Sequence, residues 1–407
     1  MKKILYAHPI IQRVMASVFI VAIFILGRYI PLPFLKLESY LTPHQSNLSW
    51  AAHLTGGDLS QIGLFSLGLS PWMYASILMT LFSIGQKGKT ISPQSAEYRK
   101  NGLMLIIAAI QGLGVAISLD YGTTDKTQQL PLIGMVAVIL VAGAFVIAWL
   151  IGLNTAYGFA GPSLLVLVSI LVGQFRVLPL MADLAADGYL FYLLGIGLWC
   201  LMSIYITVVL EKAEYRIAVQ RISIKNSLAK EAYMPVKLNL AGGMPFMYAM
   251  TLLTFPNYLL ALLAYLLPNH SESILSFGRF FSFLTLEGLL VYMVILLVLT
   301  LSFAFMNLNP TDKARELRKT GDYIPGIRPG RPTRDYLTRI VWSLGVLNGL
   351  FLIVMGGLPL FLILFLPVLQ PVVGFPGVVL MTVGIVLSII LEVEMMRLKK
   401  RYTGLFQ

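Results

Sequence analysis

Two long stretches of this sequence contain no Asp, Glu, Lys or Arg. They cover residues 127–175 and 340–391, which makes them 49 and 52 residues long. A helix that crosses a bilayer needs about 20 apolar residues, so each stretch is long enough for two spans. Only 12% of the 407 residues are charged, against about 25% in an average soluble domain. The sequence therefore predicts an all-α polytopic membrane protein and excludes a soluble enzyme, a disordered chain and a fibrous repeat.

Shorter apolar runs recur along the rest of the chain, and we count ten spans in all. Residues 127–175 hold two spans with a turn predicted over 154–158, and residues 340–391 hold another two. The span predicted over 240–266 contains Pro256, which predicts a bend. The remaining spans are predicted over residues 14–30, 70–84, 103–119, 190–210 and 289–306.

The second of these spans is interrupted. A short apolar segment, residues 48–54, is followed by Gly56 and Gly57. Ser70 and Pro71 then open the longer apolar run, and a Ser before a Pro is typical of a helix start. The second span is therefore predicted to be two half-helices, of which only the second crosses. Broken helices are tolerated in membrane proteins where they line a cavity.

The distribution of basic residues tests the number of spans. With the N-terminus placed in the cytoplasm, 25 of the 30 Lys and Arg residues fall in cytoplasmic segments, four fall in external segments, and Arg28 lies at the outer end of the first span. An excess of basic residues is typical of cytoplasmic loops. The count predicts two halves of five spans, residues 1–185 and 186–407. Because each half has an odd number of spans, the second is predicted to be inverted relative to the first.

The predicted spans lack charged residues and histidine near their centres. Transporters driven by ions or protons usually keep such groups there. A passive pore closed by apolar side chains is therefore favoured, and a secondary small-molecule transporter with inverted repeats is the alternative. The sequence has no His-Glu-x-x-His and no Gly-x-Ser-x-Gly motif, so no protease or hydrolase is supported. No enzyme activity, cofactor or metal site is predicted, and the single cysteine, Cys200, excludes an intramolecular disulfide.

Two basic loops are predicted on the cytoplasmic side, over residues 211–237 and 309–339. The second opens with Asn309 and Pro310, which predicts a short helix that Gly321 ends. The run Ile-Pro-Gly-Ile-Arg-Pro-Gly then has too much Pro and Gly for a helix or a central strand. In one interpretation, these loops do no more than fix the topology and contact anionic lipid. A stiff loop that holds arginines away from the bilayer suits docking of a protein or an RNA better.

Three well-separated segments of the chain resemble the SecY family of protein-conducting channels. Residues 57–77 resemble its broken second helix, residues 233–245 resemble the entry to its helix seven, and residues 324–336 resemble its loop between helices eight and nine. The likeness covers essentially the whole length of the chain. Residues 159–163, Phe-Ala-Gly-Pro-Ser, stand where the family usually has Gly-Asn-Gly before a serine, and the external loops are short. These departures resemble the accessory branch of the family in Gram-positive bacteria, which exports serine-rich glycosylated adhesins.

The resemblance implies a clamshell of two five-helix halves around a pore. Residues 48–64 would form a plug, and a ring of apolar side chains would seal the pore, with further members near residues 244–247 and 378–381. The ordinary interpretations are a re-entrant packing segment for the plug and plain helix packing for each ring residue. The implied plug residues are Leu54, Gly56, Gly57 and Leu64, and the implied ring residues are Met73, Ile77 and Val166.

The resemblance also implies a location and partners. The channel would lie in the bilayer of a bacterial cytoplasmic membrane with both termini in the cytoplasm, and it would pass a secretory preprotein. A SecA-type ATPase would drive transport, a SecE-type small membrane subunit would brace the channel, and a SecG-type subunit often joins. Docking of a ribosome stays open, because the same basic loops would suit the motor alone. The implied docking residues are Arg328, Arg331, Arg334, Arg216 and Arg221.

Overall fold

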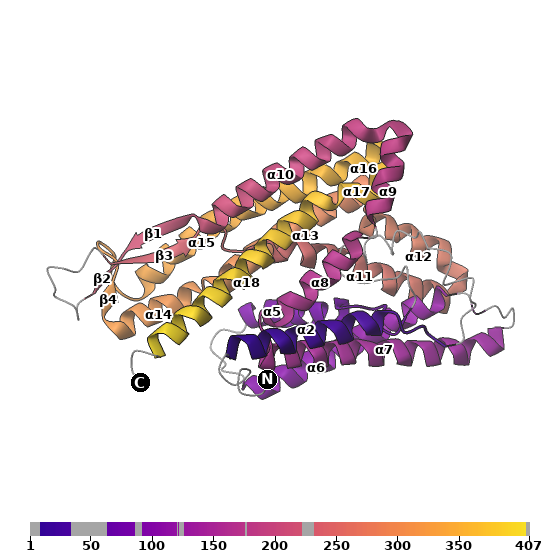
Figure 1. The fold of residues 1–407 in the computed structure, drawn as a ribbon, viewed down its shortest axis with the longest axis horizontal. Helices are drawn as coiled ribbons and strands as arrows, with labels where there is room; N and C mark the ends of the chain where they lie inside the picture. Colours follow the sequence, from indigo (N-terminus) through magenta and orange to yellow (C-terminus); the bar gives the residue numbers. More distant parts are fainter. Residues whose placement is uncertain are drawn as a thin grey trace.

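A computed structural model of the protein describes residues 9–33, 63–85, 92–119, 121, 126–175, 177–221 and 232–403. Within these residues the chain forms ten helices of at least 15 residues (Figure 1). They are α2 (Pro9–Arg28), α5 (Ser70–Gly85), α6 (Pro93–Ile117), α7 (Lys126–Tyr157), α8 (Gly161–Phe175), α10 (Leu190–Lys212), α11 (Met244–Leu266), α13 (Leu286–Asn307), α15 (Arg331–Leu352) and α18 (Phe375–Thr403).

Shorter elements connect the long helices or extend beyond them. Four short strands lie near one end of the molecule, and short helices precede α10, follow α11 and α13, and precede α18. They are β1 (Glu214–Ala218), β2 (Gln220–Arg221), β3 (Tyr233–Lys237), β4 (Asp322–Tyr323), α9 (Val177–Leu184), α12 (Ser271–Phe277), α14 (Pro310–Thr320), α16 (Leu362–Phe365) and α17 (Gln370–Val373).

The long helices confirm the prediction of ten spans. By length and composition, eight helical stretches of the described residues could cross a membrane. One of them, Gly161–Lys212, is 52 residues long and contains both α8 and α10, so it holds two spans. Helix α5 has only 16 residues and is not among the eight, but it is apolar throughout. The protein is therefore a multi-span membrane protein, and its described residues form ten long helices.

Several predicted boundaries were wrong by a few residues. Helix α5 begins at Ser70, as predicted, but α15 begins at Arg331 rather than near 340 because the helix extends beyond its apolar part. The predicted turn at 154–158 lies instead at 158–160, between α7 and α8. Asn154 explains this shift. The residue remains within α7, and its side-chain amide donates across the turn to the carbonyls of Phe159 (3.0 Å) and Gly161 (2.6 Å).

The helices lie in two layers that face each other in Figure 1. Helices α2, α5, α6 and α7 form the lower layer, and α10, α13, α15 and α18 form the upper layer. Helix α11 contacts both layers, since it packs against α5 and α6 as well as α13 and α18. Between α9 and α10 the chain passes through Gly188, whose φ of 90° is open to glycine at little strain. The predicted division of the chain at 185–186 falls on this irregular turn.

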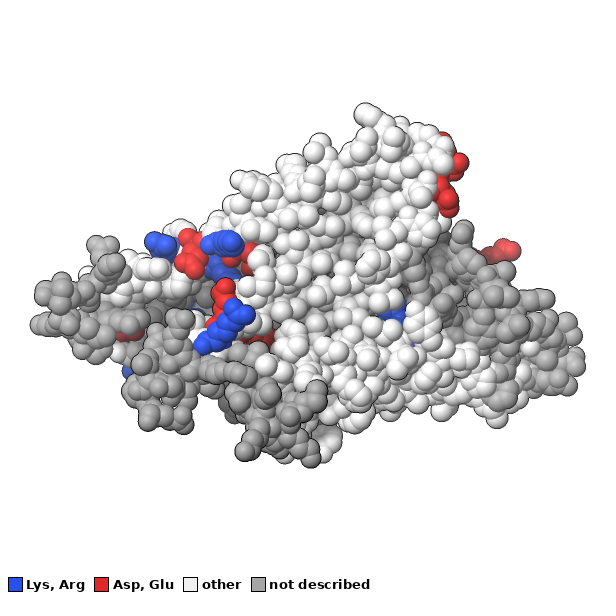
Figure 2. All heavy atoms as spheres, in the orientation of Figure 1, with Lys and Arg blue, Asp and Glu red and all other residues white. Residues whose placement is uncertain are grey.

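Polar segments gather at one end of the molecule. Strands β1 and β3 pair antiparallel, and β2 pairs with β4, so the two predicted basic loops meet there (Figure 1). The start of α2 and the end of α18 point toward the same end. On the face shown in Figure 2, most charged side chains lie near these strands, and the middle of the molecule is almost entirely uncharged. The sequence analysis did not predict the strands.

The short helix predicted after Asn309 is confirmed as α14. The Asn309 side chain accepts hydrogen bonds from the amides of Thr311 (3.2 Å) and Asp312 (3.4 Å), and Pro310 occupies the first turn. Gly321 ends the helix with a left-handed φ of 76°. Both ends follow from local chemistry, an Asn cap with Pro behind it and a C-terminal Gly.

Candidate functional site

The three predicted ring residues belong to the same cluster of buried apolar side chains, the largest among the described residues. Met73 and Ile77 are four residues apart on α5 and share one helix face. Both are almost fully buried, at 0% and 1% exposure, and Val166 on α8 is 3% exposed. All three belong to one apolar cluster at the centre of the helix arrangement. Their role as a ring stays a prediction, but the fold brings them to one place.

Helices α11 and α18 contribute to the same cluster where further ring members were expected. Met247 on α11 and Val378 and Met381 on α18 are each 3% exposed or less. Helix α18 packs against α8 and α11, and α11 packs against α5, so four helices converge here. Methionine is unbranched and adaptable, so such a cluster can close tightly and still change shape. The described arrangement is an apolar cluster that includes residues of both helix layers.

Phe246 is a central residue that the sequence analysis did not single out. Its ring is fully buried beside Met247 and meets Tyr292 edge-on, with ring centroids 5.9 Å apart. A Cβ atom on Gly356 or Gly377 would overlap this ring, so both glycines make room for it. The stretch 340–391 contains seven glycines, and nothing local in the sequence links Gly356 and Gly377 to a residue more than 100 positions earlier.

The turn before α5 is attached to the C-terminal end of α2. The Leu64 amide donates to the Ile30 carbonyl (2.9 Å), and Phe65 stacks on Phe24 with ring centroids 6.3 Å apart. The Ser66 hydroxyl and the Gly63 backbone hydrogen-bond to each other. Leu64 is half-buried in this turn. The other predicted plug residues, Leu54, Gly56 and Gly57, lie outside the described residues.

A polar contact joins α5 to α11 next to the apolar cluster. The Tyr74 hydroxyl donates to the Thr251 carbonyl and lies 3.1 Å from the Thr254 hydroxyl. The Tyr74 side chain is 1% exposed, and its ring lies 5.1 Å from that of Phe255. Because α5 and α11 fall in different predicted halves of the chain, this hydrogen bond links the two predicted halves next to the apolar cluster.

Arg28 is the only buried charged side chain among the described residues, at 6% exposure. It is the last residue of α2 rather than a central one. Its guanidinium lies 3.4 Å from the Ser169 hydroxyl and 5.8 Å from the centroid of the Phe24 ring. The described residues contain no group of three His, Cys, Asp or Glu side chains that could hold a metal ion. The described interior thus offers neither a buried carboxylate for an ion nor a metal centre.

The predicted docking residue Arg328 is exposed in the turn between β4 and α15. The Ile327 amide donates to the Ile324 carbonyl (3.1 Å), and Gly326 has a φ of 80°, which form a tight turn. The Thr333 hydroxyl, buried in α15, donates to the Arg328 carbonyl (2.9 Å). The backbone of Arg328 is therefore fixed from both sides while its guanidinium faces outward.

The other four predicted docking arginines differ in their surroundings. Arg331 and Arg334 lie in the first turn of α15 and not in a loop, which corrects the prediction, and Arg334 pairs with Asp335 at 2.8 Å. Arg216 on β1 is exposed, with its guanidinium 4.8 Å from the centroid of the Tyr233 ring. Arg221 lies on β2, opposite Asp322 of β4. The pairing of β2 with β4 brings the two predicted loops into contact.

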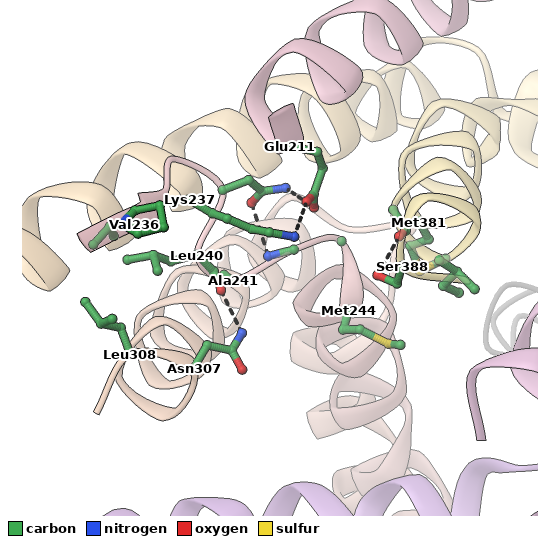
Figure 3. A pocket seen from close by; sticks show the side chains of 16 residues that line it. Glu211, Val236, Lys237, Leu240, Ala241, Met244, Asn307, Leu308, Met381 and Ser388 are labelled. Atoms are coloured by element: carbon green, nitrogen blue, oxygen red, sulfur yellow. Dashed lines mark hydrogen bonds and ion pairs between the residues drawn. The ribbon is translucent and has the colours of Figure 1, made fainter. Parts of the chain in front are cut away.

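A pocket of about 400 Å³ opens near this end of the molecule (Figure 3). It is bounded by the end of α10, the chain between β3 and α11, the end of α13 and the middle of α18. Its wall is mixed, because the carboxylate of Glu211 lies on one side and Met381 and Ile385 lie on the other. Met244 and Met381 also connect it to the buried apolar region.

The sequence of this chain matches the model of a known protein family. A family model described as SecY matches residues 63–390. The chain belongs to the SecY family. Members of this family are protein-conducting channels, so the chain is a channel subunit and not an enzyme. The three sequence motifs and the ten long helices of the described residues agree with this family.

Curated relatives point to one branch of the family. The chain is 39% identical over 408 residues to the accessory Sec system protein translocase subunit SecY2 of Streptococcus agalactiae serotype Ia, covering 100% of this chain and 99% of the relative. It is 32% identical to the subunit of the same name from Streptococcus gordonii, covering 98% of each. The predicted resemblance to the accessory branch is thereby confirmed.

Solved structures support the fold. A structure described as a protein conducting channel aligns with a TM-score of 0.64 and 16% identity, covering 94% of this chain and 91% of that one. A structure of canine Sec61 in a ribosome-channel complex aligns with a TM-score of 0.60 and 16% identity, with the same coverage. At this identity the likeness concerns the fold alone, and it agrees with the predicted ten-helix clamshell.

Proposed function

We propose that this chain is the central channel of an accessory translocase that passes unfolded secretory polypeptides across a bacterial cytoplasmic membrane. A separate SecA-type ATPase drives transport, and serine-rich glycosylated adhesins are the cargo. The names of the streptococcal relatives support the accessory assignment. The observation that carries the channel mechanism is the buried cluster in which Met73, Ile77 and Val166 meet residues of α11 and α18. A passing polypeptide would part these side chains, and they would close again behind it.

The closed state needs a seal that excludes ions yet yields to many cargo sequences. Apolar constrictions exclude ions by excluding water. In this proposal Met73, Ile77 and Val166 form that seal with Met247 and Met381. The segment 48–64 is the plug on its outer side, and the attachment of Leu64 to the end of α2 supports a fixed hinge for it. The halves 1–185 and 186–407 open as two shells about the irregular turn at Gly188.

Both termini and the strand-bearing end face the cytoplasm in this proposal, as the excess of basic residues there supports. Arg328 is the first contact of the motor, with Arg331, Arg334, Arg216 and Arg221 around it. A SecE-type small subunit, and a SecG-type one where present, cover part of the outer helix faces. The exposed side chains of Leu194, Leu198 and Leu201 on α10 support a cover of lipid or of such a helix.

Reconstitution tests the proposed function directly. The chain is placed in proteoliposomes with its small subunits, and a SecA-type ATPase, ATP and an unfolded precursor are added outside. We expect ATP-dependent protection of the precursor from added protease. The matched control replaces Phe82, an exposed residue of α5, by Lys and is compared with the same change at buried Ile77.

Two outcomes would contradict the proposal. The first is no protected precursor at a normal protein level in the vesicles. The second is flux of a small solute driven by its own gradient or by protons without any cargo, which would favour the secondary transporter instead. Loss of protection with Ile77→Lys and its retention with Phe82→Lys would support a conducting path along the buried face of α5.

A further inference from the structure

Glu211 ties the base of the β1–β3 hairpin to the end of α10 through Lys237 and Asn239. This carboxylate belongs to the last turn of α10, and its side chain is only 10% exposed. One carboxylate oxygen accepts a hydrogen bond from the Asn239 amide at 2.9 Å, and the other lies 3.7 Å from the Lys237 ammonium (Figure 3). The Leu238 amide also donates to the Ala213 carbonyl at 2.9 Å. The base of the hairpin is therefore joined to the end of α10 by both side-chain and backbone contacts.

A short connector, residues 238–243, joins this hairpin to α11. Within it, the Asn239 side chain accepts a hydrogen bond from the Gly242 amide at 3.1 Å, so one residue contacts both Glu211 and the last turn of the connector. The Leu240 carbonyl accepts from the Asn307 amide of α13 at 2.6 Å (Figure 3). Gly242 has a φ of 68°, which fixes a sharp bend just before α11. The connector is thus short and sharply bent, and its hydrogen bonds leave it little freedom to move independently of the hairpin and α11.

The space around the connector is uneven. On one side, Gly243 lies so close to α18 that a Cβ atom there would be 3.1 Å from the Met381 Cα. The pocket of about 400 Å³ lies next to this close approach, because both Gly243 and Met381 line it. The pocket leaves room for the connector to move, whereas the close approach at Gly243 limits its movement toward the α18 backbone.

The connector leads to the helix that makes the polar contact with α5. Helix α11 begins at Met244 and carries Thr251, whose carbonyl accepts the Tyr74 hydrogen bond from α5. A force on the hairpin reaches this contact only if the hairpin base and the connector move together. Coupling of this kind requires a continuous chain of contacts with two arrangements, and the Glu211 contacts supply the link that would otherwise be loose.

We propose that Glu211 is a positioning residue that couples docking at the β1–β3 hairpin to the movement of α11. The proposal rests on the proposed function, since it assumes a motor that docks near Arg328 and a pore that opens between α5 and α11. A motor that binds the open arrangement more tightly shifts the channel toward it. Glu211 transmits the movement caused by motor binding to α11, because it keeps the hairpin, Lys237 and Asn239 together as one rigid unit.

The experiment separates docking from transport. Proteoliposomes holding each channel variant are titrated with the SecA-type ATPase to measure its affinity, and precursor transport is then measured at saturating motor. For Glu211→Ala we expect an affinity within about twofold of wild type and transport lowered about tenfold, the size of effect expected when charge-assisted hydrogen bonds are lost. Glu211→Gln keeps an oxygen for Asn239 and should lose less. The matched control is Glu214→Gln, which removes an exposed charge from the same hairpin.

The outcomes distinguish this inference from the proposed function. Wild-type vesicles that pass no cargo would overturn both. Wild-type transport with unimpaired Glu211→Ala would overturn the inference alone. So would an equal fall in motor affinity, or an equal loss with Glu214→Gln, because these would indicate a general effect on the docking surface. If Glu211→Ala fails to reach the membrane, Asn239→Ala replaces it, since it breaks the Glu211 and Gly242 hydrogen bonds together and should separate affinity from transport in the same way.

Discussion

Adding one methyl group at Gly377 tests whether the centre of the molecule is as tightly packed as it looks. A Cβ atom at this position of α18 would overlap the ring of Phe246. The ring cannot turn aside easily, because Gly356 approaches it as closely and Tyr292 meets it edge-on. Overpacking of this kind costs about 1–3 kcal/mol. We expect Gly377→Ala to lower the free energy of unfolding by about 2 kcal/mol.

A double-mutant cycle shows whether the Phe246 ring is the cause. Phe246→Ala alone should lower the free energy of unfolding by about 3 kcal/mol, the lower end of the range for a deleted aromatic ring, because lipid or detergent is as apolar as the site and packing is the main loss. With the ring removed, the new methyl group meets open space. The double variant should therefore also lose about 3 kcal/mol, a coupling of about −2 kcal/mol between the two positions.

The assay is unfolding by SDS in mixed detergent micelles, followed by tryptophan fluorescence from the five Trp residues. Gly134→Ala on α7 is the control, since no atom lies within 4 Å of the added Cβ. It should be neutral or should stabilise the helix by up to about 1 kcal/mol. A neutral Gly377→Ala, or losses that add within about 0.5 kcal/mol, would refute this account of the packing.

Three further changes address other contacts. Tyr74→Phe removes the hydrogen bond to the Thr251 carbonyl, which contributes about 1 kcal/mol net to the closed state. The ion leak of the closed channel, measured in planar bilayers, should therefore rise about fivefold. An unchanged leak would contradict a role of this bond in closure. Glu392→Gln replaces the charged carboxylate that accepts a hydrogen bond from the Ala160 amide (3.1 Å) at the start of α8. The free energy of unfolding in SDS should fall by about 0.3–1 kcal/mol. Arg328→Glu should abolish export and stimulation of the motor ATPase at a normal protein level; normal export would remove Arg328 from the mechanism.

Local signals in the sequence predicted the elements whose ends depend on neighbouring residues. Asn309 with Pro310, and Gly321 eleven residues further on, bounded α14 as the structure has it. Ser70 with Pro71 marked the start of α5. The spacing of Met73 and Ile77 placed both on one face, and the structure buries that face. In each case the deciding chemistry lies within one or two helical turns.

Features that depend on distant partners were missed. Strands β1 and β3 are five residues each, and β3 contains Pro235. They become strands only because they pair with each other although they are not adjacent in the sequence. The start of α15 was placed nine residues too late, since its first turns are charged and a count of apolar residues cannot see a helix that extends beyond the membrane. The central place of Phe246 depends on Gly356 and Gly377, whose nearness only the fold creates.

The central claim is that a polypeptide passes along the buried face of α5. A photo-crosslinking residue at Ile77, which is 1% exposed, is compared with one at Phe82 on the same helix, which is 59% exposed. Membranes hold the channel, the SecA-type ATPase and a precursor stalled during export. The account predicts an ATP-dependent adduct between the precursor and position 77, and only lipid adducts from position 82. A stalled precursor that crosslinks to neither position, or equally to both, would contradict the account.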